Sequence, residues 1–200
     1  MREVTFSRHF PAYHPNKGEE TNFVEKIHCH NFLEETVKEK LSEVTLNNFI
    51  DETKAYYQYF GGLRMNYIAT YPPKLHTIRQ GKKFKVGDYI KPMVWAGRPY
   101  HKTPEGLWKI QFCDPLLIIK VYDFECTKSA YLLDGKELNK VQLEEIANND
   151  GLSLEQFECW FNKKEFSGQV ICWGNVNYQN NKGTFKLNLN NKVTNQTKQK

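Results

Sequence analysis

Alternating apolar and polar positions predict strands at the start, in the middle and near the end of the chain. In the opening stretch EVTFSRHF, residues 3–10, Val4 and Phe6 lie two positions apart and favour a first strand. The same pattern predicts strands over 64–70, 75–79, 89–95, 108–112 and 116–126, and a closing strand over 166–178. A hairpin is expected over 131–138, because Asp134-Gly135 suits a tight turn between two strands.

Two helical segments interrupt these strands, one after the first strand and one before the closing strand. Apolar positions at 23–27 follow a possible cap at Thr21 or Asn22, and further stripes cover 33–44 and 49–60. Later, a helix over 141–147 closes at Gly151, and Ser153 with Gln156 forms a capping box that opens another. The order predicts an α+β fold: a small curved sheet or a partly closed mixed β-barrel, with peripheral helices and a helical insertion over about 20–62.

Length and charge add a domain boundary. We expect one domain over 1–178, followed by a polar tail over 179–200 that has too few apolar residues to pack and is expected to be disordered. The tail contains five lysines and no acid, which equals the whole net charge of +5. A nucleic-acid surface on the domain must therefore be a local patch. No apolar run is long enough for a membrane span, and the N-terminus lacks a signal peptide, so we expect a cytoplasmic protein without a membrane partner.

The cysteines and histidines favour neither a disulfide framework nor a metal site. The five cysteines are widely spaced without a CxxC pair. His28, Cys29 and His30 are adjacent, and neighbours on a helix point about 100° apart, so they do not converge on one ion. The sequence also lacks a Gly-rich phosphate loop, a GxSxG elbow and an HExxH motif. We predict no metal and no cofactor.

The stretch PPKLHTIR, residues 72–79, is the main candidate for chemistry. The two prolines keep Lys74 out of the strand, in the turn before it. Strand alternation then places Thr77 and Arg79 on one face. An amine, a hydroxyl and a guanidinium can thus meet in one pocket, where they suit nucleophile activation and recognition of a phosphate or a base. The alternative is that all three are solvated at the end of a sheet.

The K-x-x-T-x-R pattern of Lys74, Thr77 and Arg79, followed by FKVGDYI, resembles the ASCH domain family of the PUA-like superfamily. The opening VTFSRHF, the later LEEIANNDGLSLEQF and the closing GQVICWG resemble the family's first strand, late helices and last strand. FSRHFPAYHPNKGEETNFVEKI, residues 6–27, is also similar to the N-terminus of ASCH-type proteins of bacteria and their phages. The resemblance covers most of 1–178 and implies a PUA-like barrel.

The resemblance also implies a cleft for RNA or a modified nucleobase. One branch of the family is an amidohydrolase that removes the acetyl group from acetylcytidine with a lysine, a threonine and a glutamate. Carried over by position, Thr77 is the nucleophile, Lys74 its activator and Asp150 the proton donor or acceptor. Asp150 stands where the family has the longer glutamate, and its structural alternative is a turn residue before Gly151.

Other candidates lie outside this stretch. Arg8, after the first strand, suits a phosphate or base contact, while Trp95 and Arg98, near Tyr100, suit stacking on an unpaired base. The alternative for Trp95 is core packing. Three hypotheses follow: a module that binds RNA or a modified nucleoside, an amidohydrolase or nuclease on the same cleft, and a phage-type interaction factor that docks a protein through its helical insertion.

Overall fold

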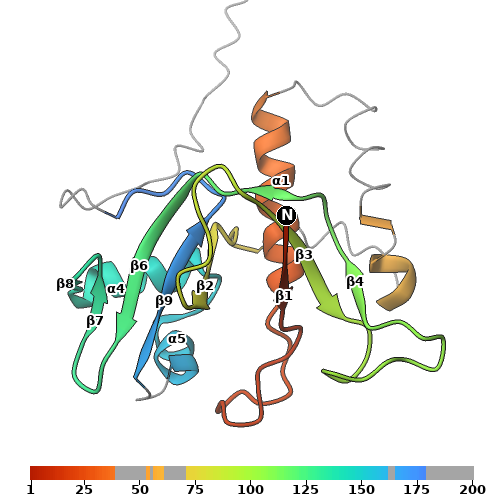
Figure 1. Cartoon of the computed structure of the whole chain (residues 1–200), viewed down its shortest axis with the longest axis horizontal. Helices are drawn as coiled ribbons and strands as arrows, with labels where there is room; N and C mark the ends of the chain where they lie inside the picture. The colour runs from red at the N-terminus through yellow and green to blue at the C-terminus, as the bar shows by residue number, and fades with distance from the viewer. Residues whose placement is uncertain (39–52, 55, 61–70, 162–164, 179–200) are drawn as a thin grey trace, which may run out of the picture.

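The computed structural model describes residues 1–38, 53–54, 56–60, 71–161 and 165–178, with the side chains of α1 described as far as Asn31. These residues form an α+β fold of two sheets with helices packed against them (Figure 1). Predicted features at 41–52, the strand over 64–70 and the tail lie outside the described residues.

The first sheet is built around β3 (Tyr89–Trp95), whose bounds match the predicted strand. β1 (Arg2–Phe6) pairs with it in parallel, while β4 (Lys109–Gln111) and β5 (Leu116–Leu117) pair antiparallel. Ile90 and Val94 are fully buried on one face of β3, so Lys91 and Trp95 belong to the opposite face.

The second sheet has the order β2-β9-β6-β7-β8. Its strands are β2 (His76–Gln80), β9 (Phe166–Cys172), β6 (Lys120–Cys126), β7 (Tyr131–Leu133) and β8 (Lys136–Glu137). β9 lies between β2 and β6, and both of its faces are covered, because the consecutive residues Val170, Ile171 and Cys172 are all buried. Gly168 allows β2 to approach, since a Cβ there would lie 2.2 Å from the Arg79 carbonyl oxygen.

Three helices follow the predicted signals. α1 (Phe23–Lys38) begins directly after Asn22 and contains the first stripe and the start of the second. α4 (Lys140–Asn149) and α5 (Leu154–Phe161) follow the second sheet's hairpin, and the predicted Ser153–Gln156 capping box is present. Residues 53–54 and 56–60 are helical as well, within the predicted insertion. In the described part of the chain, no helix is both long and apolar enough to cross a membrane.

Three predictions about the sheets need correction. The closing strand expected over 166–178 ends at Cys172. Among the described strands the barrel is not closed, because β1 pairs only with β3 and β2 only with β9. The expected single strand over 116–126 is two strands, since the chain changes sheets at Ile118 and Ile119. The Ile118 amide donates to Asp88 beside the first sheet, and the Ile119 amide donates to Cys172 in the second.

Candidate functional site

Lys74 lies in the turn before β2, as its two preceding prolines predict. Its amide donates to the Lys26 carbonyl at 3.0 Å, and its carbonyl accepts from Trp173 Nε1 at 3.0 Å. These contacts fix the backbone on both sides and direct the side chain inward, where it is fully buried. The Nζ atom lies 4.1 Å from the centroid of the Phe23 ring, so an aromatic face covers the ammonium.

Asp150 provides the counter-charge for Lys74. Its Oδ1 lies 2.5 Å from Lys74 Nζ, which also donates to the Asp150 carbonyl oxygen. Asp150 ends α4, and Gly151 follows with a φ of +78° that favours glycine. A Cβ at Gly151 would meet Lys26 Cδ at 3.0 Å and Lys74 Cβ at 3.6 Å, so this glycine also lets the lysines pack against the helix end.

Burial dominates the electrostatics of this pair. It lowers the pKa of Lys74 to about 8, while the charge and hydrogen bond of Asp150 act in the opposite direction. Burial likewise raises the pKa of Asp150, opposed by Lys74, Arg79 and Lys26. With a pKa of about 8, Lys74 has a larger fraction of neutral amine at physiological pH than an exposed lysine has.

His76 is the second titratable group beside Asp150. Its Nε2 lies 3.8 Å from Asp150 Oδ1, beyond hydrogen-bond distance, and within the described residues it is the one buried side-chain nitrogen or oxygen without a hydrogen-bond partner. Burial and the charge of Lys74 hold the pKa of His76 well below its usual value. The imidazole is therefore neutral at pH 7.

The hydrogen bonds around His76 indicate its tautomer. Tyr178 Oη lies 2.7 Å from His76 Nδ1, and Asn149 Nδ2 donates to the same oxygen at 3.0 Å. Burial raises the pKa of Tyr178, which keeps the phenol protonated. The phenol hydrogen is then directed at Nδ1, which accepts it. This arrangement favours the tautomer with the ring proton on Nε2, which makes Nε2 a donor without a partner beside Asp150.

Arg79 and Thr77 belong to the other face of β2. Arg79 Nη2 donates to the Thr5 carbonyl of β1 at 3.0 Å, so a side chain bridges the two edge strands that a closed barrel would join. Its guanidinium lies 5.1 Å from the Phe6 ring centroid, and burial lowers its pKa to about 10, opposed by the charge of Asp150. Thr77 is buried, and in the strand register it lies opposite Ile171 of β9.

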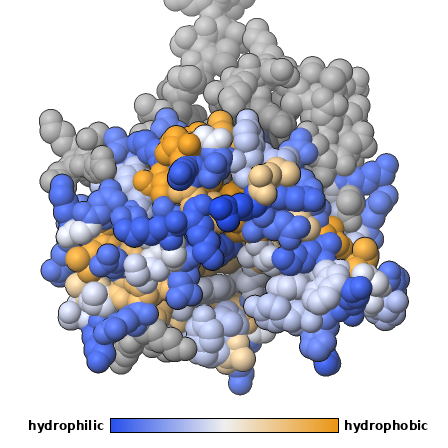
Figure 2. All heavy atoms as spheres, viewed as in Figure 1, coloured by the Kyte–Doolittle hydropathy of each residue, from blue (hydrophilic) through white to orange (hydrophobic). Residues whose placement is uncertain are grey.

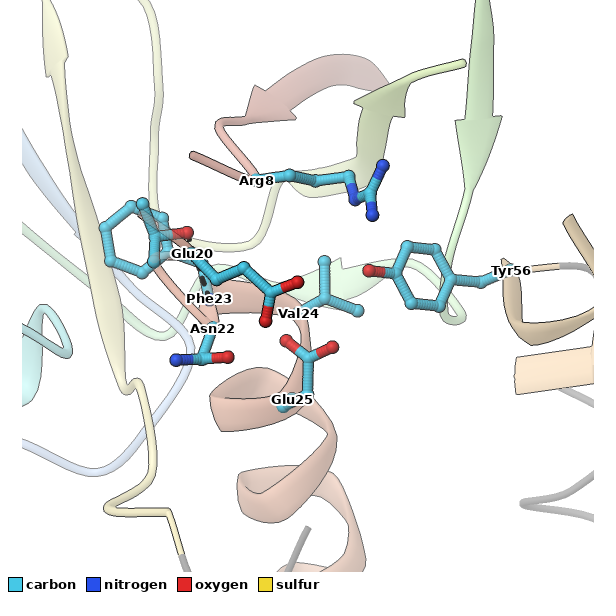
Figure 3. Close-up of a pocket in the computed structure, with 8 residues that line it drawn as sticks. Arg8, Glu20, Asn22, Phe23, Val24, Glu25 and Tyr56 are labelled. Carbon is cyan, nitrogen blue, oxygen red and sulfur yellow. Dashed lines mark hydrogen bonds between the residues drawn. The ribbon is translucent and has the colours of Figure 1, made fainter. Parts of the chain in front are cut away.

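A small cavity lies at the start of α1. Arg8, Glu20, Glu25 and Tyr56 extend toward it from different parts of the chain (Figure 3). Its volume is about 30 Å³, enough for one or two water molecules. Burial and the neighbouring Glu20 raise the pKa of Glu25. Phe23 belongs to both places, because it is among the residues that line this cavity and its ring covers Lys74 Nζ.

The sequence-predicted residues thus fall into three places. Lys74 and Asp150 are in direct contact, and Arg79 interacts with Asp150 through its charge. Arg8 lines the small cavity and lies 3.7 Å from the Phe60 ring centroid. Trp95 and Arg98 belong to the β3–β4 region, away from the cavity lining.

Sequence reasoning did not identify His76 or Tyr178 as members of the centre. Alternation placed His76 on the face opposite Thr77, but nothing local indicates that Tyr178, about a hundred positions later, approaches its ring.

Comparison of the whole chain with family models, curated proteins and solved structures found no match to any of them.

Proposed function

We propose that this chain binds a modified nucleoside, free or within RNA, at the centre formed by Lys74, Asp150 and His76. The observation that carries the proposal is the buried Lys74–Asp150 pair, with the histidine nitrogen that lacks a hydrogen-bond partner beside it. A buried ion pair is weak support for stability, and an orphaned buried donor costs about 1–3 kcal/mol. Groups with this combination of burial, coupling and shifted pKa are typical of functional sites.

The donors define the ligand's chemistry. Lys74 Nζ and His76 Nε2 both offer hydrogens, and Lys26 and Arg79 place two further positive charges around a single carboxylate. Such a centre suits a ligand rich in acceptor atoms, as carbonyl-bearing pyrimidines are. The resemblance of the Lys74–Thr77–Arg79 pattern to the ASCH family, whose domain is a PUA-like barrel, supports the same ligand class.

Access requires movement of Phe23. The cavity in front of this ring is too small for a base, and the ring lies directly over Lys74 Nζ. Rotation of the ring away from the ammonium would uncover Lys74 Nζ beside a residue that also lines the cavity. Arg8 and Tyr56 on the cavity wall would then contact the outer part of the ligand.

Calorimetric titration of cytidine and acetylcytidine into the full chain tests this proposal. We expect binding by wild type, loss of at least tenfold in affinity for Lys74→Met, and no change for Lys82→Met. Lys82 is a matched control because it also pairs with an aspartate, Asp123 at 2.5 Å, but on the surface. Failure of wild type to bind either nucleoside, or equal loss in both variants, would refute the proposal.

The Lys74–Asp150 contact also favours a second candidate function, hydrolysis of the acyl amide. In this reading the neutral amine of Lys74, favoured by its lowered pKa, takes the proton of the Thr77 hydroxyl as the oxygen attacks the amide carbonyl, and protonated Asp150 gives its proton to the leaving cytidine amine. Water then hydrolyses the acetyl-threonine ester, which releases acetate and restores the Thr77 hydroxyl. Chromatography of acetylcytidine should then show acetate and cytidine, and Thr77→Ala should abolish both products. Binding without any product would leave a binding module and reject the hydrolase.

A further inference from the structure

A second surface lies at the end of the first sheet, where β3 and β4 are joined. We define the β3–β4 surface as Trp95, Arg98, Tyr100, Lys102, Trp108 and Lys109. The connection between these strands extends away from both sheets at the lower right of Figure 1. Tyr100 is 77% exposed and Trp108 is 47% exposed, an unusual position for two large aromatic rings.

The backbone holds these rings in a defined arrangement. Tyr100 has a φ of +64°, which is costly for a residue with a bulky side chain. Its ring centroid lies 4.9 Å from that of Trp95, at an interplanar angle of 54°. The loop therefore keeps one face of an aromatic pair in solvent, and the strained residue at its centre is typical of a binding loop.

Cations surround the aromatic rings. Lys102 Nζ lies 5.8 Å from the Trp108 ring centroid, and Lys109 Nζ lies 4.9 Å from that of Trp95. Arg98 is exposed in the same connection. Over residues 91–109 the sequence contains four lysine or arginine side chains and one acid, Glu105.

The positive charge of this segment differs from the rest of the domain. The domain as a whole is balanced, because the five tail lysines equal the net charge. Figure 2, drawn in the same orientation, shows hydrophilic and near-neutral residues over this connection rather than a continuous apolar patch. Interleaved rings and cations match a chain of bases and phosphates better than an apolar protein surface.

We infer that the β3–β4 surface binds single-stranded nucleic acid. Unpaired bases stack on Tyr100 and Trp108, while Arg98 and Lys102 contact the phosphates. A duplex does not offer its base faces and is disfavoured. The inference goes beyond the proposed nucleoside site and stands on different residues, so that either can fail alone. It gives the chain a means of holding a strand that carries the nucleoside.

Substitution of Glu3 tests whether the affinity for nucleic acid rises when a negative charge is removed from this surface. Its carboxylate lies 3.1 Å from Lys109 Nζ and would repel an approaching phosphate. Glu3→Gln frees the lysine, and we expect tighter binding of an oligonucleotide at low salt. A structural role of the same residues does not predict a gain.

The experiment is fluorescence anisotropy of a labelled twelve-residue RNA, the same sequence as DNA, and its duplex, each titrated with the full chain at two salt concentrations. Replacing an aromatic ring on which a base stacks typically costs about 1–3 kcal/mol of binding free energy per base. Tyr100→Ala and Trp108→Ala should therefore each weaken single-strand binding by about 5- to 150-fold. Tyr100→Phe should retain it, and Arg98→Gln should reduce its salt dependence.

Two controls make the result decisive. Tyr89→Ala removes a half-exposed tyrosine at the opposite end of β3 and should leave the affinity unchanged. A full-length variant with the five tail lysines changed to glutamine should keep most of the affinity. The inference is wrong if that variant loses all binding, if the duplex binds as tightly as the single strand, or if Tyr100→Ala and Trp108→Ala bind like wild type. Equal nucleoside affinity in Tyr100→Ala and wild type separates this surface from the Lys74 centre.

Discussion

Removal of one partner of the Lys74–Asp150 pair should cost much more stability than removal of both. Lys74→Met replaces the fully buried ammonium with an apolar chain of similar length, and leaves the Asp150 carboxylate buried without its main counter-charge. Single removals of this type cost about 3–5 kcal/mol, because an uncompensated charge remains. We expect a loss toward the lower end of that range, since Lys26 and Arg79 still act on Asp150.

The double variant Lys74→Met/Asp150→Asn removes both charges and should recover at least about 2 kcal/mol relative to Lys74→Met. Urea unfolding followed by tryptophan fluorescence measures this as a return of the midpoint at unchanged slope. Lys82→Met should leave the midpoint unchanged, because its pair with Asp123 is on the surface. If the double variant is as unstable as the sum of the two single variants, the charges are not coupled and the reasoning is refuted.

The remaining predictions concern the pH dependence and the cover of the same centre. Because the pKa of Lys74 is lowered to about 8, the unfolded chain binds more protons than the folded chain above that pH. The free energy of unfolding of wild type, relative to that of Lys74→Met, should therefore rise between pH 8 and 9.5, by at most about 1.4 kcal/mol per pH unit. A difference that does not change with pH would contradict the shift. In nitrogen-15 NMR, His76 should carry its proton on Nε2 and stay neutral at pH 5.5, because burial and Lys74 lower its pKa; a titration near pH 6.5 or a proton on Nδ1 would contradict the assignment. Phe23→Leu should destabilise the chain by about 1–2 kcal/mol, because the smaller side chain fills less of the core. It should also tighten nucleoside binding several-fold, because it uncovers Lys74 Nζ. Weaker binding would show that the ring holds the ligand rather than excludes it.

Local patterns predicted the elements that depend on local chemistry. β3 has the bounds that alternation gave, and the hairpin turn at Asp134-Gly135 has the positive φ values, +49° and +75°, that its sequence favours. The capping box at Ser153 opens α5, and the prolines place Lys74 before its strand. In each case neighbouring residues determine the backbone.

These local patterns could not predict contacts between residues that are far apart in the sequence. The change of sheet at Ile118 depends on a partner amide and carbonyl thirty and more positions away, so an unbroken apolar run concealed it. The link between the edge strands is a side-chain contact from Arg79 to Thr5, which alternation does not reveal. Likewise, the roles of His76 and Tyr178 follow from the meeting of β2 with the end of the chain. The Lys74–Asp150 contact was anticipated only through the family resemblance.

The most direct test of the proposed function is acetylcytidine binding by the full chain compared with the Lys74→Met/Asp150→Asn double variant. This variant removes both charges of the centre and, by the argument above, remains folded. The account predicts calorimetric heat for wild type and at least a tenfold lower affinity for the double variant, with the two showing similar unfolding midpoints. Equal affinity in two folded proteins would show that the ligand does not contact this centre, and would contradict the account.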